Sequence, residues 1–500
     1  MKKPNIVLIM VDDMGYSDLG CYGSEIRTPN LDQLAAEGLR FSQFYNAARC
    51  CPTRASLLTG LYPHQAGVGH MIHFEREGPY QGYLNDRCIT IAEVLKQGGY
   101  ATYMSGKWHV GEDRPHWPVD RGFDRHYGLI GGAMNYFDIR KGKTPKVQRR
   151  FAKQGEAHVP PSEGFYATDA FTDFAIECID DHKGADQPFF LYLAYTAPHW
   201  PLHALPEDIA RYRGRYMEGW PAVRKQRYQR LIELGLINAT WPLSGQDDAA
   251  TDWDSLTDEQ KQVMDHKMAI YAAQIDRMDQ GVGKVMEALK RNGYDDDTLV
   301  MFLSDNGACH ESGSLGRNFR PDLDGEMGSV DSYHSYGLSW SNASNTPFRK
   351  HKSWVHEGGI ATPLIVRFPS RIPKPGHITH QLGHVVDIMT TCCDAAGINY
   401  PREFEGHALT PSEGLSLLPV FEGRERQPHD LLYWEHYGNR AVRSGKWKLV
   451  EDGTDSRQGG WELYDMESDR TELNNLVDAR PEVAKELKAK YSAWAERVRV

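Results

Sequence analysis

Short runs of apolar, β-branched and aromatic residues recur along the chain, separated by longer amphipathic segments. Each run is continuous rather than alternating, which is typical of strands that are covered on both faces. The clearest runs are NIVLIMV (5–11), YATYMS (100–105), PFFLYLAY (188–195), TLVMFLS (298–304) and TPLIVRF (362–368). Such runs predict the central strands of a buried sheet.

The segments between the runs have apolar residues at helical spacing, which predicts helices over 28–41, 90–99 and 268–293. Glycines close the second segment at its C-terminal end, and the third leads into the run at 298–304. Strands joined by crossover helices predict an α/β fold with a doubly wound, mostly parallel sheet.

The pattern changes after residue 425, where two short strands flanked by turn residues are predicted in 441–453 and 459–466. A final helix is predicted from DARPEV, with Asp478 as its cap. Its apolar face consists of Val483, Leu487, Tyr491, Trp494 and Val498. We therefore predict a main domain over 1–425 and a C-terminal α+β subdomain over 426–500, an antiparallel sheet plus a helix.

The composition excludes several classes of protein. A formal net charge of −11 over 500 residues argues against a general nucleic-acid binder. The eight cysteines show no CxxC spacing, which excludes a disulfide scaffold and a zinc ribbon. The longest apolar run at the N-terminus, 6–11, is far below the ~18 residues of a membrane span. As written, we expect no membrane insertion and a cytoplasmic location, or a periplasmic or secreted one if an export signal has been removed.

Polar residues cluster where the predicted strands end, and ligands of open α/β sheets bind outside the carboxyl ends of the strands. The residues after the strands are Asp12 and Asp13, Lys107 and His109, His199, and Asp305 and Asn306, while Lys352 precedes the last strand. A lone residue of this kind is most often a turn cap or solvated surface. A functional site is indicated because all these residues are expected at the same edge of the sheet.

Asp12, Asp13, Asp305 and Asn306 form an all-oxygen set that suits a hard divalent cation, Ca²⁺ or alternatively Mg²⁺. Either pair alone would most simply cap a turn, but two pairs beside cationic residues favour a metal. A two-zinc site would be expected to include histidine ligands, so Asn306 indicates one hard metal. The positive groups, Arg54, Lys107, His109 and Lys352, would hold a tetrahedral oxyanion next to it.

The stretch CCPTRASLLTG (50–60) has the pattern C-x-P-x-R followed by a leucine-rich turn and T-G, and it resembles the signature of type I sulfatases, the formylglycine-dependent branch of the alkaline phosphatase superfamily. The resemblance extends over most of the chain. The other matching stretches are PNIVLIMVDDMGYSDLGCYG, TPNLDQLAAEGLRFSQFY, SGKWHVG, APHWP, LSDNG, TPFRKHKSWVHEGGIATPLIVRFP and the C-terminal GKWKLV and WELYDMESDRTELNNL. It implies an alkaline-phosphatase-like fold and hydrolysis of sulfate monoesters.

In this family a separate maturation enzyme oxidises the first cysteine of the signature to formylglycine. Pro52 and Arg54 stand two and four residues after Cys50, so the resemblance places the modification at Cys50 and makes Cys51 the variable residue. Thr53 occupies the second variable position, where serine or alanine is common. The hydrated aldehyde, a geminal diol, would attack the sulfur and form a covalent hemiacetal sulfate.

The resemblance also implies roles for the polar residues. His199 with Lys352 would neutralise or protonate the leaving oxygen, and Lys107 with Lys352 would bind the sulfate oxygens. His109 would take the proton of the remaining hydroxyl and so expel sulfate. Asp12, Asp13, Asp305 and Asn306 match the family's metal ligands, usually for calcium, with Asp305 also near the diol and Arg54 favouring its ionised hydroxyl.

Two other functions stay open. A phosphate or phosphonate monoester hydrolase of the same superfamily would favour a more cationic site or a second metal. A non-catalytic sulfated-glycan binding protein would be expected to lack Cys50, Arg54, His109 or Lys352, and all four are present.

The resemblance implies a small-molecule or glycan sulfate ester as the substrate. The context of Lys352, SYGLSWSNASNTPFRKHK, looks like the arylsulfatase branch and favours aryl sulfates, with carbohydrate or steroid sulfates as alternatives. Aromatic residues in 71–86 and 331–345 would stack on a ring or serve as ordinary packing. The basic segment 139–153 has seven basic residues and no acidic one, which would help recruit glycans, although such segments, like the polar insertion 201–265, are more often solvated.

Overall fold

A central sheet of eleven strands forms the body of the protein in the computed structural model, which describes residues 3–72, 77–144, 149–453 and 460–500. The strand order is β10-β2-β9-β8-β1-β7-β3-β4-β5-β6, and β11 also pairs with β2. The strands are β1 (Asn5–Val11), β2 (Leu39–Tyr45), β3 (Ala101–Gly106), β4 (Arg125–Leu129), β5 (Phe151–Lys153), β6 (Glu156–Ala157), β7 (Phe189–Ala194), β8 (Thr298–Ser304), β9 (Ala361–Arg367), β10 (His377–Thr379) and β11 (Gly383–His384).

The five predicted strands correspond to β1, β3, β7, β8 and β9 within one residue at each end. The first four run parallel, but β9 is antiparallel to both β8 and β2. The reason is that the segment from 305 to 360 crosses the carboxyl edge and re-enters the sheet there, where the Ser304 N–H donates to the Thr362 hydroxyl at 3.0 Å. Residues just before β9 therefore lie at the same edge as those after β8.

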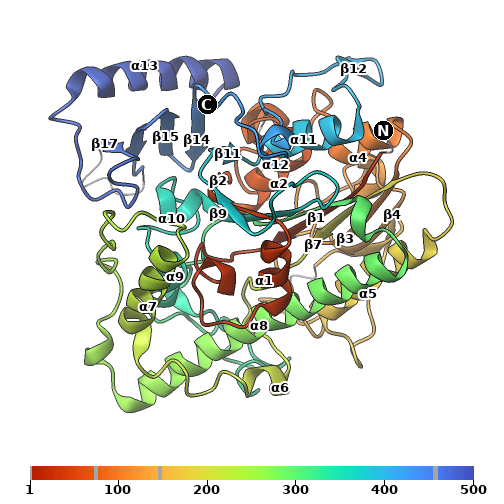
Figure 1. Cartoon of the computed structure of the whole chain (residues 1–500). Coiled ribbons are helices and arrows are strands. Elements are labelled where there is room, and N and C mark those ends of the chain that lie inside the picture. Colours follow the sequence, from red (N-terminus) through yellow and green to blue (C-terminus); the bar gives the residue numbers. More distant parts are fainter. Residues whose placement is uncertain (1–2, 73–76, 145–148, 454–459) are drawn as a thin grey trace.

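Helices cover both faces of the sheet (Figure 1). One face carries α1 (Pro29–Ala36), α5 (Ala167–Asp181) and α8 (Asp258–Arg291), and the other carries α2 (Cys50–Thr59), α4 (Ile91–Gln97) and α11 (Asp387–Ala396). Alternate residues of β1 contribute to the two cores, with Val7 and Ile9 on one side and Leu8 on the other. This is why the strand is apolar at every position.

The predicted helix over 28–41 is wrong in its second half. α1 ends at Ala36, and β2 begins at Leu39. A Cβ on Gly38 would lie 2.0 Å from the Val366 carbonyl oxygen, so the chain turns into the sheet where only glycine fits. The predicted helix over 268–293 in fact begins at Asp258, where Thr257 and Gln260 form a capping box.

The insertion 201–265 is better packed than its polar composition indicates. It contains α6 (Pro206–Ile209) and α7 (Gly219–Glu233), and Trp220 is buried against Trp253 and Trp340, with ring centroids 4.8 and 5.4 Å away. The remaining short helices are α3 (Pro63–Ala66), α9 (Gly337–Ser344), α10 (Glu357–Ile360) and α12 (Leu418–Phe421), and β12 (Glu403–Phe404) pairs with β13 (His407–Ala408). Among the described residues, we find no helix long and apolar enough to cross a membrane.

The C-terminal part contains four antiparallel strands rather than the two predicted. They are β14 (Leu432–His436), β15 (Asn439–Ser444), β16 (Trp447–Glu451) and β17 (Trp461–Asp465). α13 (Pro481–Val498) covers them with the buried side chains of Leu487, Tyr491, Trp494 and Val498, as the apolar face predicts, while Val483 is partly buried. The helix is preceded by Arg480 with no side-chain cap, so Asp478 is not its cap.

Buried charges join this antiparallel sheet to the main body. Glu357 in α10 accepts from Lys448 of β16 at 2.9 Å and from Arg470 at 2.8 Å, and Lys448 also pairs with Glu472 at 2.7 Å. All four side chains are fully buried. The network fixes the segment before β9, which carries Lys352, against the C-terminal sheet.

Candidate active site

All ten predicted site residues meet at the carboxyl edge of the central sheet, and each is at least nine-tenths buried. Seven of them follow β1, β3, β7 or β8, Cys50 and Arg54 lie in α2, and Lys352 precedes β9. The seven residues lie together because the carboxyl ends of parallel strands meet at one edge of the sheet. Lys352 joins them because β9 enters the sheet from the same edge.

Cys50 is the first residue of α2, where the helix dipole is positive. A hydrogen bond from the Cys51 thiol, together with the charges of Lys107 and His109, holds the pKa of Cys50 well below its usual range. Burial instead raises the pKa of Cys51, whose sulfur lies 3.7 Å from the Met71 sulfur. The two neighbouring cysteines therefore have different surroundings.

Three ion pairs surround Cys50. Lys107 Nζ lies 2.6 Å from Asp12 Oδ2, and Lys352 Nζ lies 2.8 Å from Asp13 Oδ1. One turn after Cys50, Arg54 donates to Asp305 Oδ2 at 2.8 Å. Burial opposes the charged form of Lys107, but the negative charges of Asp12, Cys50 and Asp305 together outweigh it and raise the pKa, so the lysine remains a cation.

The predicted metal ligands fit an oxygen-preferring cation. Asn306 Nδ2 donates to Asp13 Oδ1 at 2.7 Å, whereas the Asn306 Oδ1 atom and the Asp12 Oδ1 atom are buried without a hydrogen-bond partner among the described residues. A buried oxygen left unpaired costs about 1–3 kcal/mol. Burial and the charge of Asp12 also raise the pKa of Asp305 well above its usual range, which a nearby cation would counteract. Calcium or magnesium bound by the four residues would satisfy both unpaired oxygens.

His109 contacts the Cys50 side chain, and burial with the charge of Lys107 lowers its pKa to about 3. The imidazole is therefore neutral at physiological pH and able to accept a proton. Gly132 lies directly against it, because a Cβ there would be 2.9 Å from His109 Nε2. His109 itself has φ 60°, and Asp13 and Ala48 have φ 67° and 65°. Such strained backbone at three positions is typical of a site whose geometry is fixed by its surroundings.

A cavity of about 410 Å³ opens onto these residues. Cys50, His109, His199 and Lys352 line its inner part. His199 Nε2 lies 3.3 Å from Asp13 Oδ2 and 3.4 Å from Lys352 Nζ. Cys51 is fully buried and does not line the cavity.

The rest of the lining was not predicted as individual site residues. It includes Arg49, Lys143, Arg149, Trp200, Glu311 and Phe319. The only sequence signal was the basic segment 139–153, whose residues 145–148 lie outside the described residues. The aromatic residues of 331–345 proved to be mostly packing, since Tyr333, Tyr336 and Trp340 are buried in the core. Of the 71–86 segment, residues 73–76 are likewise outside the described part, and Tyr83 stacks on His116.

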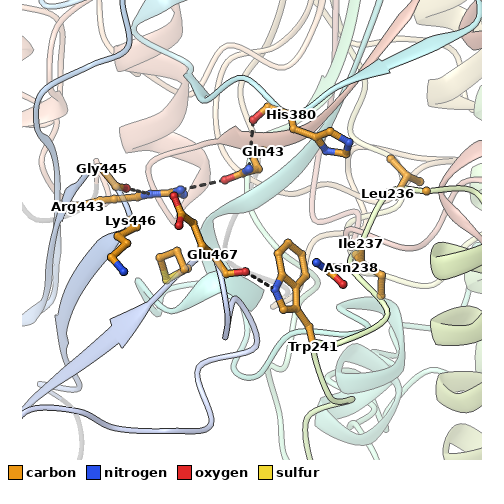
Figure 2. A pocket seen from close by; sticks show the side chains of 12 residues that line it. Gln43, Leu236, Ile237, Asn238, Trp241, His380, Arg443, Gly445, Lys446 and Glu467 are labelled. Atoms are coloured by element: carbon orange, nitrogen blue, oxygen red, sulfur yellow. Dashed lines mark hydrogen bonds between the residues drawn. The ribbon is translucent and has the colours of Figure 1, made fainter. Parts of the chain in front are cut away.

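A second cavity, of about 420 Å³, lies between the 235–241 loop, β2 and the C-terminal sheet (Figure 2). The Trp241 indole N–H donates to the Glu467 carbonyl at 2.9 Å, and Arg443 donates to the Gln43 side chain at 2.9 Å. The described residues that line it include none of the ten site residues. We therefore assign the chemistry to the cavity at Cys50.

A doubly wound sheet with carboxylates, cations and a cysteine at one edge defines a hydrolase with the alkaline-phosphatase-like fold. The Sulfatase family model matches residues 4–398, and the model for the C-terminal part of N-sulphoglucosamine sulphohydrolase matches 348–497. The chain belongs to the sulfatase family and is a sulfuric ester hydrolase.

Individual relatives agree. An uncharacterized sulfatase of Schizosaccharomyces pombe is 36% identical over 97% of this chain and 92% of its own. An arylsulfatase of Klebsiella aerogenes is 36% identical over 85% of this chain and 93% of its own. The crystal structure of i-CgsB in complex with k-i-k-neocarrahexaose aligns with TM-score 0.73 and 27% identity, covering 99% of this chain and 93% of that one.

Proposed function

We propose that the enzyme hydrolyses sulfate monoesters with a formylglycine at position 50 as nucleophile. The observation that carries the proposal is the difference between the two neighbouring cysteines. Cys50 lines the cavity beside Lys107 and His109, whereas Cys51 is fully buried and does not line it. The modification requires a maturation enzyme as a partner. Release of 4-nitrophenol from 4-nitrophenyl sulfate by the matured protein, and not by the unmatured one, is the expected result, and equal rates would contradict the proposal.

The hydrated aldehyde supplies one hydroxyl that attacks sulfur and a second whose deprotonation releases sulfate and restores the aldehyde. The surrounding residues bind the sulfate and transfer the protons. Lys107 and Lys352 bind the sulfate oxygens as fixed cations. His199, together with Lys352, neutralises or protonates the leaving oxygen. Neutral His109, in contact with residue 50, accepts the proton of the second hydroxyl.

Asp12, Asp13, Asp305 and Asn306 would hold one calcium ion, with magnesium as the alternative. The ion would supply Lewis-acid stabilisation of charge on the sulfate. The unpaired oxygens of Asp12 and Asn306 support this assignment. Aryl sulfates are the assayable substrates we propose, because Trp200 and Phe319 offer stacked rings beside the site.

Asn306→Ala is expected to weaken calcium binding by about 10–100-fold, because one ligand oxygen is lost. Calorimetric titration of the chelated protein with Ca²⁺ measures this directly, and calcium should raise the melting temperature of the wild type more than that of the variant. Asn238→Ala, at an exposed position, serves as the control. Full activity of rigorously metal-free enzyme would contradict the assignment.

Gly132→Ala is expected to lower kcat by about 10–100-fold with little change in KM, because the new methyl group would displace the His109 imidazole. Gly245→Ala is a matched control, since a Cβ at Gly245 meets nothing within 4 Å. Steady-state kinetics of both variants check the prediction. Wild-type kcat in the Gly132 variant would exclude His109, at its present position, from the reaction.

A phosphate or phosphonate monoester hydrolase remains the second candidate. The comparison of 4-nitrophenyl sulfate with 4-nitrophenyl phosphate on the same matured sample decides between them. We expect a higher kcat/KM for the sulfate, and the opposite order would favour the second candidate.

A further inference from the structure

Two stacked aromatic rings form one wall of the catalytic cavity. The centroids of Trp200 and Phe319 are 4.7 Å apart, and the ring planes differ by 25°. The Trp200 indole N–H donates to Glu311 Oε2 at 2.8 Å, and Arg49 Nη2 pairs with Glu311 Oε1 at 2.8 Å. Glu311 therefore holds Trp200 in place, and the two rings offer a flat surface to the part of the substrate beyond the sulfate.

Two basic side chains, Lys143 and Arg149, line the cavity on the same side. Lys143 Nζ lies 4.3 Å from the Phe319 ring centroid and 5.0 Å from that of Trp200. Partial burial lowers the pKa of Lys143, and the charges of Arg149 and Arg317 lower it further, while the Glu311 carboxylate opposes the shift. Two aromatic rings and two arginines thus lie near Lys143, and Glu311 does not fully offset them. A further anion would favour the charged form of Lys143.

Other basic residues of the same segment, unlike Lys143 and Arg149, have acidic partners. Arg140 pairs with Asp138, Lys141 with Asp331, and Arg150 with Asp113. Within the described parts of the chain, no carboxylate lies within ion-pair distance of Lys143 or Arg149. Of the basic side chains that line the cavity, Arg49 and Lys352 have ion pairs, whereas Lys143 and Arg149 have none among the described residues.

The sulfate position does not need these two charges. Lys107, Lys352 and Arg54 already surround residue 50, each with its own carboxylate, and the charge of Arg49 is matched by Glu311. Lys143 and Arg149 thus provide positive charge at a different place, beside the aromatic wall and the leaving-group side marked by His199.

We propose that Lys143, Arg149 and the Trp200–Phe319 wall form a subsite for a second anionic group on the alcohol part of the substrate. The natural substrate class is then a carbohydrate sulfate that carries at least one further sulfate or carboxylate, and aryl sulfates serve as assay substrates. The inference rests on the proposed function. A sugar ring fits the wall, the volume of about 410 Å³ accommodates a charged mono- or disaccharide, and the second anion replaces the missing acidic partner.

Binding to the unmatured protein with calcium tests the subsite without requiring turnover. Calorimetry compares N-acetylgalactosamine 6-sulfate with its 4,6-disulfate, and glucosamine 6-sulfate with its N,6-disulfate. A 6-sulfated disaccharide that carries a uronate distinguishes a carboxylate from a sulfate as the second anion. We expect at least one doubly charged sugar to bind the wild type about tenfold more tightly than its singly charged counterpart.

The double variant Lys143→Gln/Arg149→Gln should reduce this preference to less than about threefold. Lys141→Gln/Arg150→Gln, which removes two paired charges from the same segment, should retain it.

The inference is overturned if none of the doubly charged sugars binds more than about threefold more tightly to the wild type, or if the Lys143→Gln/Arg149→Gln variant keeps the preference. Failure of the proposed function has a different signature. Matured wild type that shows the binding preference but releases no sulfate from any of these esters would contradict the reaction and leave the subsite in place.

Discussion

Cys50→Ala, produced together with the maturation enzyme, is expected to lose sulfate-ester turnover by a factor on the order of 10⁴ or more, because the residue that provides the nucleophile is gone. The fold should be retained, since alanine is accommodated at the first position of α2 and Cys50 contacts the cavity. Kinetics with 4-nitrophenyl sulfate and a thermal melt measure the two effects separately.

Cys51→Ala is the matched control. This side chain is fully buried against Met71 and lies outside the cavity, so we expect activity within about tenfold of wild type and a loss of about 1–2 kcal/mol in stability. Inactive Cys51→Ala with active Cys50→Ala would show that the wrong cysteine has been assigned.

Glu357→Ala is expected to lower the free energy of unfolding by about 3–5 kcal/mol, because it leaves the charges of Lys448 and Arg470 buried with a single remaining acid, Glu472. Urea unfolding followed by tryptophan fluorescence measures the loss. Glu422→Ala, which removes a partly exposed partner of Arg371, should cost less than about 1 kcal/mol. Equal losses in both variants would contradict a special role for the buried network.

The same network gives an acid dependence. Burial opposes ionisation of Glu357, but Lys448 and Arg470 overcome it and lower its pKa from 4.5 to about 2. Since the folded pKa lies below the unfolded one, the stabilisation is present above pH 4.5 and is lost as pH falls towards 2. The Glu357→Ala variant should therefore show a shallower loss of stability over this range than the wild type.

The central strands were predictable because β1, β3, β7 and β8 are apolar on both faces, a pattern that only a doubly covered strand requires. The direction of β9 was not predictable, because it depends on where the 305–360 segment crosses the sheet. The end of α1 was missed for a related reason. Gly38 marks a close approach to Val366, which is a tertiary contact.

The inner site followed from local rules, since residues after parallel strands meet at one edge. The outer part of the cavity could not be predicted in this way. Lys143, Trp200 and Phe319 come from three distant loops, and the sequence spacing of these residues contains no information about how the loops meet. The division into a main domain over 1–425 and a subdomain over 426–500 remains a prediction.

Peptide mass spectrometry across residues 48–60 of protein produced with the maturation enzyme tests the central claim most directly. We predict the thiol-to-aldehyde mass change at Cys50 and an unmodified thiol at Cys51. An aldehyde at Cys51, or intact thiols at both positions when a control peptide is converted by the same enzyme, would contradict the proposed nucleophile.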